Sequence, residues 1–261
     1  MYGVLSKIIS ESLLSAYPVF VKYIKIPIFL QMWSRFFSYV VVAAFFMDWS
    51  YVAANLMSHD GIMLALLTIG HIYVSYKGFL KLDSGAAYSI FYTYPVMILL
   101  LSGFKIPPGA LLAIAGVWLL ASTSALDRVP YEGVIMILLA AFSEALIFFV
   151  VKRLKTKNNW DHLFISYFLG ALLFTFYFLR AGDTSLTTTL TESLGINTVI
   201  ALGGYVLRFY AITHLDVFKY ALLSNLGMVT AYLYGYLMGE NFTFTQAVGT
   251  ACIIYACAKA H

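Results

Sequence analysis

Two glutamates inside long apolar stretches are the residues of this sequence best suited to chemistry. Glu11 lies within residues 10–13 (Ser-Glu-Ser-Leu), and Glu144 lies within residues 143–146 (Ser-Glu-Ala-Leu), 133 residues further along. An ionised carboxylate at the centre of a bilayer costs about 2.5–3.5 kcal/mol on insertion scales, so it usually faces a cavity or a partner. Each glutamate could hold either a proton or a cationic substrate. Alternatively, each is a structural carboxylate that an internal arginine neutralises or that serine or tyrosine binds.

Two arginines and a histidine also fall in apolar stretches. Arg35 and Arg208 are the natural counter-charges of the glutamates. If either pairs with a glutamate, the site suits zwitterions or carboxylates better than cations, because an arginine fork matches a carboxylate. The alternative is that these side chains extend to the membrane interface. His71 could relay protons, or it could be a hydrogen-bonded histidine of the core.

Further polar residues could line a cavity and orient a substrate. Tyr92 belongs to a stretch that also contains Tyr88 and Tyr94. Ser224 and Asn225 occupy the related part of the second half, with Asn225 at the position of Tyr92. The chain has 20 tyrosines and 21 phenylalanines, so many aromatic side chains must face lipid. Cavity lining and lipid contact therefore both stay open for the tyrosines.

Sequence signatures of several enzyme classes are absent. The chain has no His-Glu-x-x-His, no Gly-x-Ser-x-Gly and no Gly-x-x-x-x-Gly-Lys-Ser/Thr motif. We therefore expect neither an enzyme nor an ATP-driven pump, and we expect no cofactor and no bound metal.

The elements that position these residues must lie in a membrane. Of the 261 residues, 62% are hydrophobic and 11% are charged, whereas a typical soluble domain is about 45–50% apolar and about 25% charged. The mean hydropathy is +0.86. This composition excludes a soluble enzyme and a disordered chain. Continuous apolar runs such as residues 98–101 lack the alternation of a transmembrane β-barrel, so the sequence predicts an all-α integral membrane protein.

Ten apolar stretches approach the length of about 20 residues that a membrane span needs. They cover residues 3–23, 28–47, 61–80, 84–103, 107–124, 132–152, 162–180, 196–214, 217–237 and 243–260. Pro18 and Pro95 interrupt the first and fourth stretches, where a proline frees backbone carbonyls and permits a kink. Asp83 and Asp216 each precede a span, and we expect them to cap the following helix.

The two halves of the chain are related by an internal repeat with an offset of 133 residues. The offset superimposes Glu11 on Glu144, Gly70 on Gly203, Leu82-Asp83 on Leu215-Asp216, and Gly116 on Gly249. Five spans per half would make the second half enter the membrane from the opposite side. We therefore predict ten transmembrane helices as a 5+5 inverted-topology repeat, with repeats at residues 1–127 and 128–261. The substrate site would lie near the midplane between them.

Basic residues are slightly more numerous in the loops on the N-terminal side, mainly because of the loop at residues 152–157. The positive-inside rule then places both termini in the cytoplasm, and we expect a plasma membrane or an inner membrane. The net charge of +4 is spread over the loops and does not indicate nucleic-acid binding.

Several short segments together resemble the EamA-type domain of the drug/metabolite transporter superfamily. They are residues 34–37 (Ser-Arg-Phe-Phe), residues 76–87 with Pro95-Val96 and Gly116, residues 226–229 (Leu-Gly-Met-Val), and residues 239–243 with Gly249. The first half departs from the family pattern, because Pro107 stands at the position that matches Glu240. The resemblance implies five plus five helices, cytoplasmic termini and carriage of small metabolites or drugs. The small multidrug carriers of this superfamily are similar in placing a glutamate in their first span.

These observations predict a secondary active transporter that moves a small polar or cationic metabolite by alternating access, with proton-coupled export as one mode. Its partners would be the small-molecule substrate, protons and the lipid bilayer, with no nucleic acid, and it would work as a monomer or homodimer. The alternative is a non-transporting membrane module that handles lipid or serves as an assembly subunit.

Overall fold

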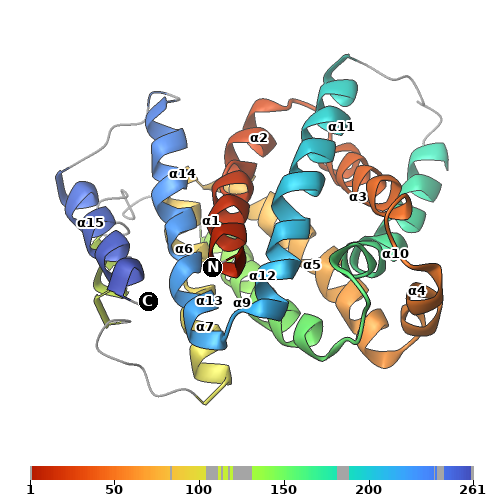
Figure 1. The fold of residues 1–261 in the computed structure, drawn as a ribbon. Coiled ribbons are helices and arrows are strands. Elements are labelled where there is room, and N and C mark those ends of the chain that lie inside the picture. Colours follow the sequence, from red (N-terminus) through yellow and green to blue (C-terminus); the bar gives the residue numbers. More distant parts are fainter. Residues whose placement is uncertain are drawn as a thin grey trace.

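The computed structural model describes residues 2–82, 84–103, 131–180, 188–237 and 244–259, together with residues 111, 112, 114–116, 118, 119 and 239. Its regular structure over these residues is entirely helical (Figure 1). The first half contains α1 (Tyr2–Leu14), α2 (Tyr17–Tyr23), α3 (Ile28–Ala44), α4 (Trp49–Leu56), α5 (His59–Lys81), α6 (Ser84–Phe91) and α7 (Tyr94–Leu101). The second half contains α9 (Tyr131–Arg153), α10 (Asn159–Arg180), α11 (Thr188–Ile200), the π-helix η2 (Ala201–Tyr205), α12 (Val206–His214), α13 (Val217–Ser224), α14 (Leu226–Leu237) and α15 (Phe244–Lys259).

Helices occupy the stretches that the sequence predicts to span the membrane. The stretch at 107–124 lies largely outside the described residues, and so do Asp83 and the predicted boundary between residues 127 and 128. Five helical segments are long and apolar enough to cross a membrane: Tyr2–Tyr23, His59–Lys81, Tyr131–Arg153, Asn159–Arg180 and Thr188–His214. Ile28–Ala44 and Ala247–Ala256 are shorter apolar helices. The number of ten spans and the inverted repeat stay predictions.

The outward faces of these helices are apolar, as a lipid environment requires. Leu66, Phe142, Leu172, Phe176 and Leu233 are each about half exposed or more. Exposed apolar surface on this scale is rare in monomeric soluble proteins. Helix length, composition and exposure together describe a multi-pass integral membrane protein.

Three helical interruptions lie within the described residues. Ser15 and Ala16 separate α1 from α2, Tyr92 and Thr93 separate α6 from α7, and Asn225 separates α13 from α14. The breaks at Tyr92 and Asn225 are 133 residues apart, which is the offset of the repeat.

Prolines account for two of these breaks. Pro18 and Pro95 lie in the first turn of α2 and α7, where the missing N–H cannot bond to the preceding turn. The predicted interruptions therefore occur just before each proline. The break before α14 has no such proline, because Met228 stands where Pro95 stands in the first half, and the sequence did not predict it.

Helix α4, which the sequence did not predict, lies in the connection between α3 and α5. Asp48 caps it, because its carboxylate accepts the Ser50 N–H at 3.1 Å. Lys157 Nζ donates to Asp48 Oδ2 at 2.6 Å, and the Asp48 N–H donates to Asp161 Oδ1 at 2.8 Å. The Lys157 hydrogen bond lowers the pKa of Asp48 from 3.8 to about 2 and raises the pKa of Lys157. These contacts join the α3–α4 loop of the first half to the α9–α10 loop of the second.

Helix contacts recur in related pairs between the two halves. Helices α3 and α10 pack against each other; α3 also contacts α11, and α10 also contacts α5. Helix α5 packs against α9, just as α1 packs against η2 and α12. Helices α6 and α7 contact α9, whereas α13 and α14 contact α1. In Figure 1, α3 and α10 lie on one side of the bundle and α14 and α15 on the other.

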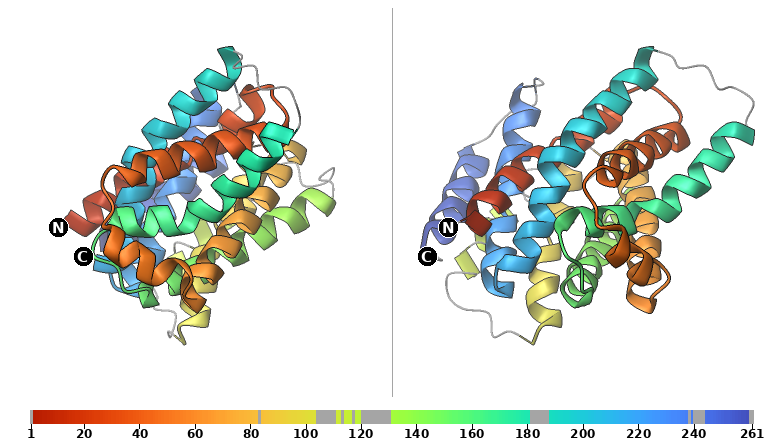
Figure 2. Two further views of the ribbon diagram at one scale, coloured as in Figure 1. Left: turned by 90° about the vertical axis from the view of Figure 1, so that its right-hand side faces the viewer. Right: turned by 45° about the vertical axis from the view of Figure 1, so that its right-hand side comes forward.

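Two glycines related by the repeat offset touch each other. A Cβ on Gly116 would lie 2.6 Å from the carbonyl oxygen of Gly249, so only glycine permits this approach. The marks for the two chain termini lie close together in Figure 1 and in both views of Figure 2. Asp216 caps α13 as predicted, since its carboxylate accepts the Lys219 N–H at 2.8 Å.

Candidate functional site

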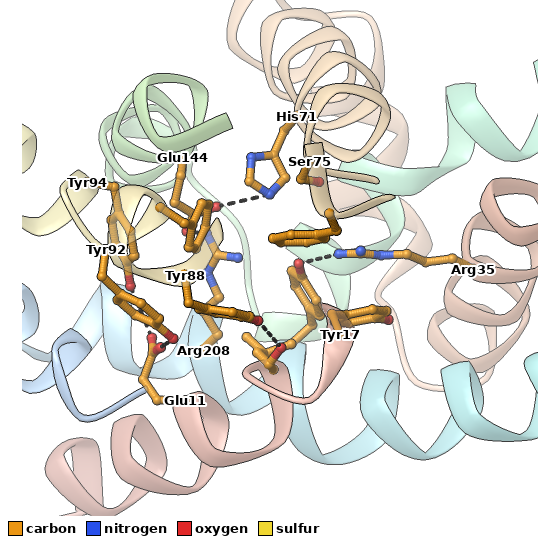
Figure 3. Close-up of a pocket in the computed structure, with 14 residues that line it drawn as sticks. Glu11, Tyr17, Arg35, His71, Ser75, Tyr88, Tyr92, Tyr94, Glu144 and Arg208 are labelled. Atoms are coloured by element: carbon orange, nitrogen blue, oxygen red, sulfur yellow. Dashed lines mark hydrogen bonds and ion pairs between the residues drawn. The ribbon is translucent and has the colours of Figure 1, made fainter. Parts of the chain in front are cut away.

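A small cavity lies between helices of both halves (Figure 3). Its volume is about 40 Å³, room for only a few water molecules. The first half lines it with Glu11, Leu14, Tyr17, Arg35, His71, Ser75, Phe79, Tyr88, Phe91, Tyr92 and Tyr94, and the second half with Glu144, Tyr205 and Arg208. The structure thus brings together most of the residues that the sequence singles out: Glu11, Arg35, His71, Tyr92, Glu144 and Arg208.

Glu11 is buried on α1, at 4% exposure. The Tyr92 hydroxyl donates to Glu11 Oε2 at 3.0 Å, and the Tyr94 hydroxyl donates to Oε1 at 3.2 Å. The break between α6 and α7 directs both hydroxyls toward α1, because Tyr92 lies in the break and Tyr94 begins α7. Gly227 of α14 packs directly behind this cluster; its Cβ, if present, would collide with the Tyr92 hydroxyl and lie 2.5 Å from Glu11 Oε2.

Lys7 is the cation that neutralises Glu11. Its ammonium pairs with Glu11 Oε1, and its side chain is completely buried. The ammonium also lies over the Tyr220 ring, 3.6 Å from the centroid, which adds a cation–π attraction. The sequence analysis treated Lys7 as a loop residue and missed this pair. The spacing of four residues was the available signal, because it places both side chains on one face of a helix.

Glu144 of α9 forms an ion pair with Arg208 of α12 through Oε1 and Nη2. Both are buried, at 2% and 4% exposure. Helix α9 contacts α12 directly, so the pair crosses a helix–helix contact inside the second half. Arg208 is therefore placed as a counter-charge to a glutamate, and its charge does not extend to the membrane interface.

His71 faces the second oxygen of Glu144. His71 Nδ1 lies 3.1 Å from the Ala140 carbonyl oxygen, which can only accept, so we assign the ring proton to Nδ1. Nε2 of the neutral ring is then an acceptor, and it lies 3.6 Å from Glu144 Oε2, too far for a hydrogen bond. Two bare acceptors face each other here, and one added proton would join them.

Arg35 of α3 sits in a cage of tyrosines and is 2% exposed. Its guanidinium donates to the hydroxyls of Tyr76 at 3.5 Å, Tyr167 at 3.2 Å, and Tyr205. The guanidinium carbon lies 4.2 Å from the Tyr17 ring centroid and 5.0 Å from that of Tyr205. The side chain does not extend to the interface, and among the described residues no carboxylate forms an ion pair with it.

The charges around the cavity do not balance. Lys7 and Glu11 cancel, and so do Arg208 and Glu144. Arg35 then remains as one positive charge in excess among the described residues near the cavity. Figure 3 shows both glutamates on one side of the cavity and Arg35 on the opposite side.

Ser224 and Asn225 lie outside the cavity lining. The Ser224 hydroxyl donates to the Tyr220 carbonyl at 2.8 Å on its own helix. The Asn225 amide donates to the carbonyls of Ala221 and Leu222, and its Oδ1 is buried without a hydrogen-bond partner among the described residues. Both side chains point along α13 because the helix ends at Ser224, just before the unpredicted break at Asn225.

Tyr17 and Tyr205 are cavity residues that the sequence analysis did not single out. Tyr205 ends the π-helix η2, a wider helical turn that is frequent at functional sites. No motif marks either tyrosine among the 20 in the chain. Only the packing of η2 against α1 and α3 brings Tyr205 to Arg35.

Comparisons with known proteins identify the family to which the second half is related. Residues 131–259 match the model of the EamA-like transporter family. Among curated proteins none matches the sequence. One solved crystal structure, 16% identical in sequence, is similar over 99% of this chain and 96% of its own, with a TM-score of 0.73. This similarity shows a shared fold.

Proposed function

We propose a transport function for this protein, because the chain belongs, through residues 131–259, to the EamA-like transporter family. It would be a secondary active transporter that moves a small polar metabolite across a membrane by alternating access. The observation that carries the proposal is the charged cavity itself, which side chains of both halves line. A buried, charged cavity within membrane-spanning helices is costly and is typical of a substrate or ion pathway.

The exchange of helix contacts between the halves supports the inverted repeat that such a carrier needs. The offset of 133 residues maps α5 onto α11–α12, α3 onto α10 and α9 onto α1–α2. It therefore converts the contact of α3 with α11 into that of α10 with α5, and both contacts are present. The contact between Gly116 and Gly249 is mapped onto itself, as expected at a two-fold pseudo-axis.

Alternating access would rock the two repeats about the cavity. The cavity of about 40 Å³ is too small for most metabolites, so this arrangement corresponds to a closed state in which the substrate path is shut. The breaks at Tyr92 and Asn225 occupy related positions in the two repeats, where discontinuous helices of carriers can bend. The Tyr92 break carries a ligand of Glu11, so bending there would couple to the charged cluster.

Proton coupling would act at His71 and Glu144. With Nδ1 protonated, Nε2 and Oε2 face each other at 3.6 Å with no hydrogen between them. A proton taken up here would create a hydrogen bond and weaken the hold of Glu144 on Arg208. Glu11 is less suited, because Lys7 and two tyrosine hydroxyls already occupy its oxygens.

A cationic cargo would have to displace a resident cation, either Lys7 from Glu11 or Arg208 from Glu144. The structure therefore gives less support to a cation than the isolated glutamates gave. We also propose both termini in the cytoplasm, with the protein in a plasma or inner membrane, working as a monomer or homodimer.

The test is proton release by the purified protein in weakly buffered detergent near neutral pH, on addition of pools of amines, amino acids, small carboxylic acids or nucleotide sugars. We expect one pool to release protons and to drive saturable counterflow in proteoliposomes. Glu144→Gln should abolish the release, whereas Glu11→Gln should retain it. Glu132→Gln is the matched control, since Glu132 is exposed and pairs with Lys81. Release that survives Glu144→Gln would contradict proton coupling at this site.

Lipid handling is a second candidate, because an apolar groove of about 610 Å³ runs between α5 and α9. Ile62, Leu66, Leu139 and Phe142 form its walls, and His71 lies at its base and also lines the cavity. Acyl chains of the bilayer would fit such a groove. Movement of labelled lipid between leaflets, with no counterflow of any solute pool, would favour this candidate over solute transport.

A further inference from the structure

Arg35 differs from the other buried cations of the site in having no anionic partner. Lys7 and Arg208 each contact a glutamate, whereas Arg35 contacts only neutral tyrosines among the described residues. Its Nε–H is buried without a hydrogen-bond partner there. A buried charge without a counter-charge is strongly unfavourable, so the cage leaves Arg35 ready for an anion.

The tyrosine cage stabilises the guanidinium only in part. Five rings lie around it, with centroid distances of 4.2 Å to Tyr17, 5.0 Å to Tyr205, 5.6 Å to Tyr39, 5.6 Å to Tyr76 and 5.9 Å to Tyr167. Ring faces and hydroxyl oxygens attract a cation, but they do not cancel its charge. The cage therefore holds the guanidinium in place while leaving its charge uncompensated.

The surroundings of the cage carry hydroxyl and amide groups and no acid. A second, smaller cavity adjoins Tyr17 and Tyr76, and its polar lining consists of those two tyrosines with Gln31, Ser193 and Asn197. The Tyr17 hydroxyl donates to Asn197 Oδ1 at 2.8 Å, and the Asn197 amide donates to Ser34 Oγ at 3.2 Å. An anion at Arg35 would thus meet donors and no repelling carboxylate on this side.

We propose that the substrate carries a carboxylate and that Arg35 binds it, with the tyrosine cage around the head group. The proposal rests on the transport function and names its substrate class. The carboxylate would approach from the cavity, where Arg35 stands opposite the two neutralised glutamates (Figure 3). A planar guanidinium binds a carboxylate through paired N–H groups, and binding would bring the net charge of the site from positive to zero.

Two series of probes of matched shape test the charge preference. The first is acetate, acetamide and ethylamine, and the second is benzoate, benzamide and benzylamine. Binding to the purified full-length protein is measured by calorimetry, and counterflow of the same compounds is measured in proteoliposomes. The variants are Arg35→Gln and Arg35→Lys, with Arg153→Gln as the control because Arg153 is exposed and pairs with Asp60.

We expect the carboxylate of a series to bind about tenfold or more tightly than its amide, as a charge-assisted hydrogen bond implies. Arg35→Gln should abolish this preference while leaving the affinity for the amide unchanged, which a merely structural arginine would not do. Arg35→Lys should keep part of the preference, and Arg153→Gln should keep all of it. If Arg35→Gln does not fold, partial loss of the preference in Arg35→Lys carries the test.

Each contrary result has a separate meaning. Binding of amines in preference to carboxylates, or a carboxylate preference that survives Arg35→Gln, would overturn the carboxylate site even if counterflow proves transport. Carboxylate binding that depends on Arg35 but drives no counterflow would support the site and contradict the transport function. Failure of all six probes to bind would overturn the carboxylate site.

Discussion

Lys7 and Arg208 show that the two related glutamates obtain their counter-charges in different ways. Glu11 pairs within its own helix, and Glu144 pairs across a contact between α9 and α12. The repeat offset places Ala140 opposite Lys7 and Ser75 opposite Arg208. The carboxylates therefore follow the repeat and the cations do not, which makes the two sides of the cavity chemically different.

Lys7→Met should destabilise the protein by about 3 kcal/mol or more, because it leaves Glu11 as a buried carboxylate without a cation. Combining it with Glu11→Gln should restore most of the loss, since no buried charge remains. Unfolding in mild detergent, followed by intrinsic fluorescence, measures the three variants. Lys219→Met is the control, because Lys219 pairs with Asp216 on the surface at 3.9 Å, where such a pair contributes about 1 kcal/mol or less. Equal destabilisation by the single and double variants would contradict the ion pair.

The sequence identified charged residues of the cavity because a charge within an apolar run is rare. Glu11, Glu144, Arg35 and Arg208 were all recognisable on that ground, and the cavity contains them. The tyrosines of the Arg35 cage could not be recognised, since they are hidden among many others. Asn225 was assigned by its register with Tyr92, but register fixes the position of a residue and not the direction of its side chain.

At the level of helices, the two loops joined by Asp48 and Lys157 connect the halves of the chain far from the cavity. Asp48 accepts hydrogen bonds from Lys157 and Ser50 and also caps α4. The Lys157 bond lowers the pKa of Asp48 below its ordinary value of 3.8. A carboxyl with a lowered pKa stabilises the folded state when it is ionised.

Asp48→Asn should therefore lower the melting temperature at neutral pH. The difference between wild type and variant should shrink as the pH falls from 3.8 to about 2, because protonation removes the contribution of Asp48 from the wild type as well. Lys157→Met should produce the same pattern through the other partner. Thermal unfolding in detergent across this pH range is the measurement, and a difference that stays constant to about pH 2 would contradict the assigned interaction.

Helix interruptions were predictable only where a proline causes them. Pro18 and Pro95 indicated the first two breaks, because a proline removes a backbone donor. The break at Asn225 arises from tertiary packing around Gly227, which must admit Tyr92 and Glu11. Helix α4 is only eight residues long and has no extended periodic pattern, so neither feature left a clear signal in the sequence.

For the whole molecule, composition alone established the membrane and the helical fold, because no soluble arrangement could bury so much apolar surface. The family match and the shared fold of a solved structure agree with that assignment. The repeat was visible only in rare residues such as Glu11 and Gly116. Its physical support is the exchange of contacts among α3, α5, α10 and α11, which no comparison of residues could reveal.

The central claim is that the cavity between the halves opens to each side of the membrane in turn. Ser75 lines the cavity and is 3% exposed, so Ser75→Cys places a thiol there with little change in volume. The variant would be made in a background with Cys252→Ala and Cys257→Ala. Its labelling by a membrane-impermeant thiol reagent would be measured in right-side-out and inside-out vesicles.

We predict that the thiol at position 75 is labelled in both vesicle orientations, and that a transported substrate changes both labelling rates. A control cysteine at Lys219, on an exposed loop position, should react in only one orientation whether or not substrate is present. Labelling of position 75 from a single side under every condition, or from neither side, would contradict alternating access in this protein.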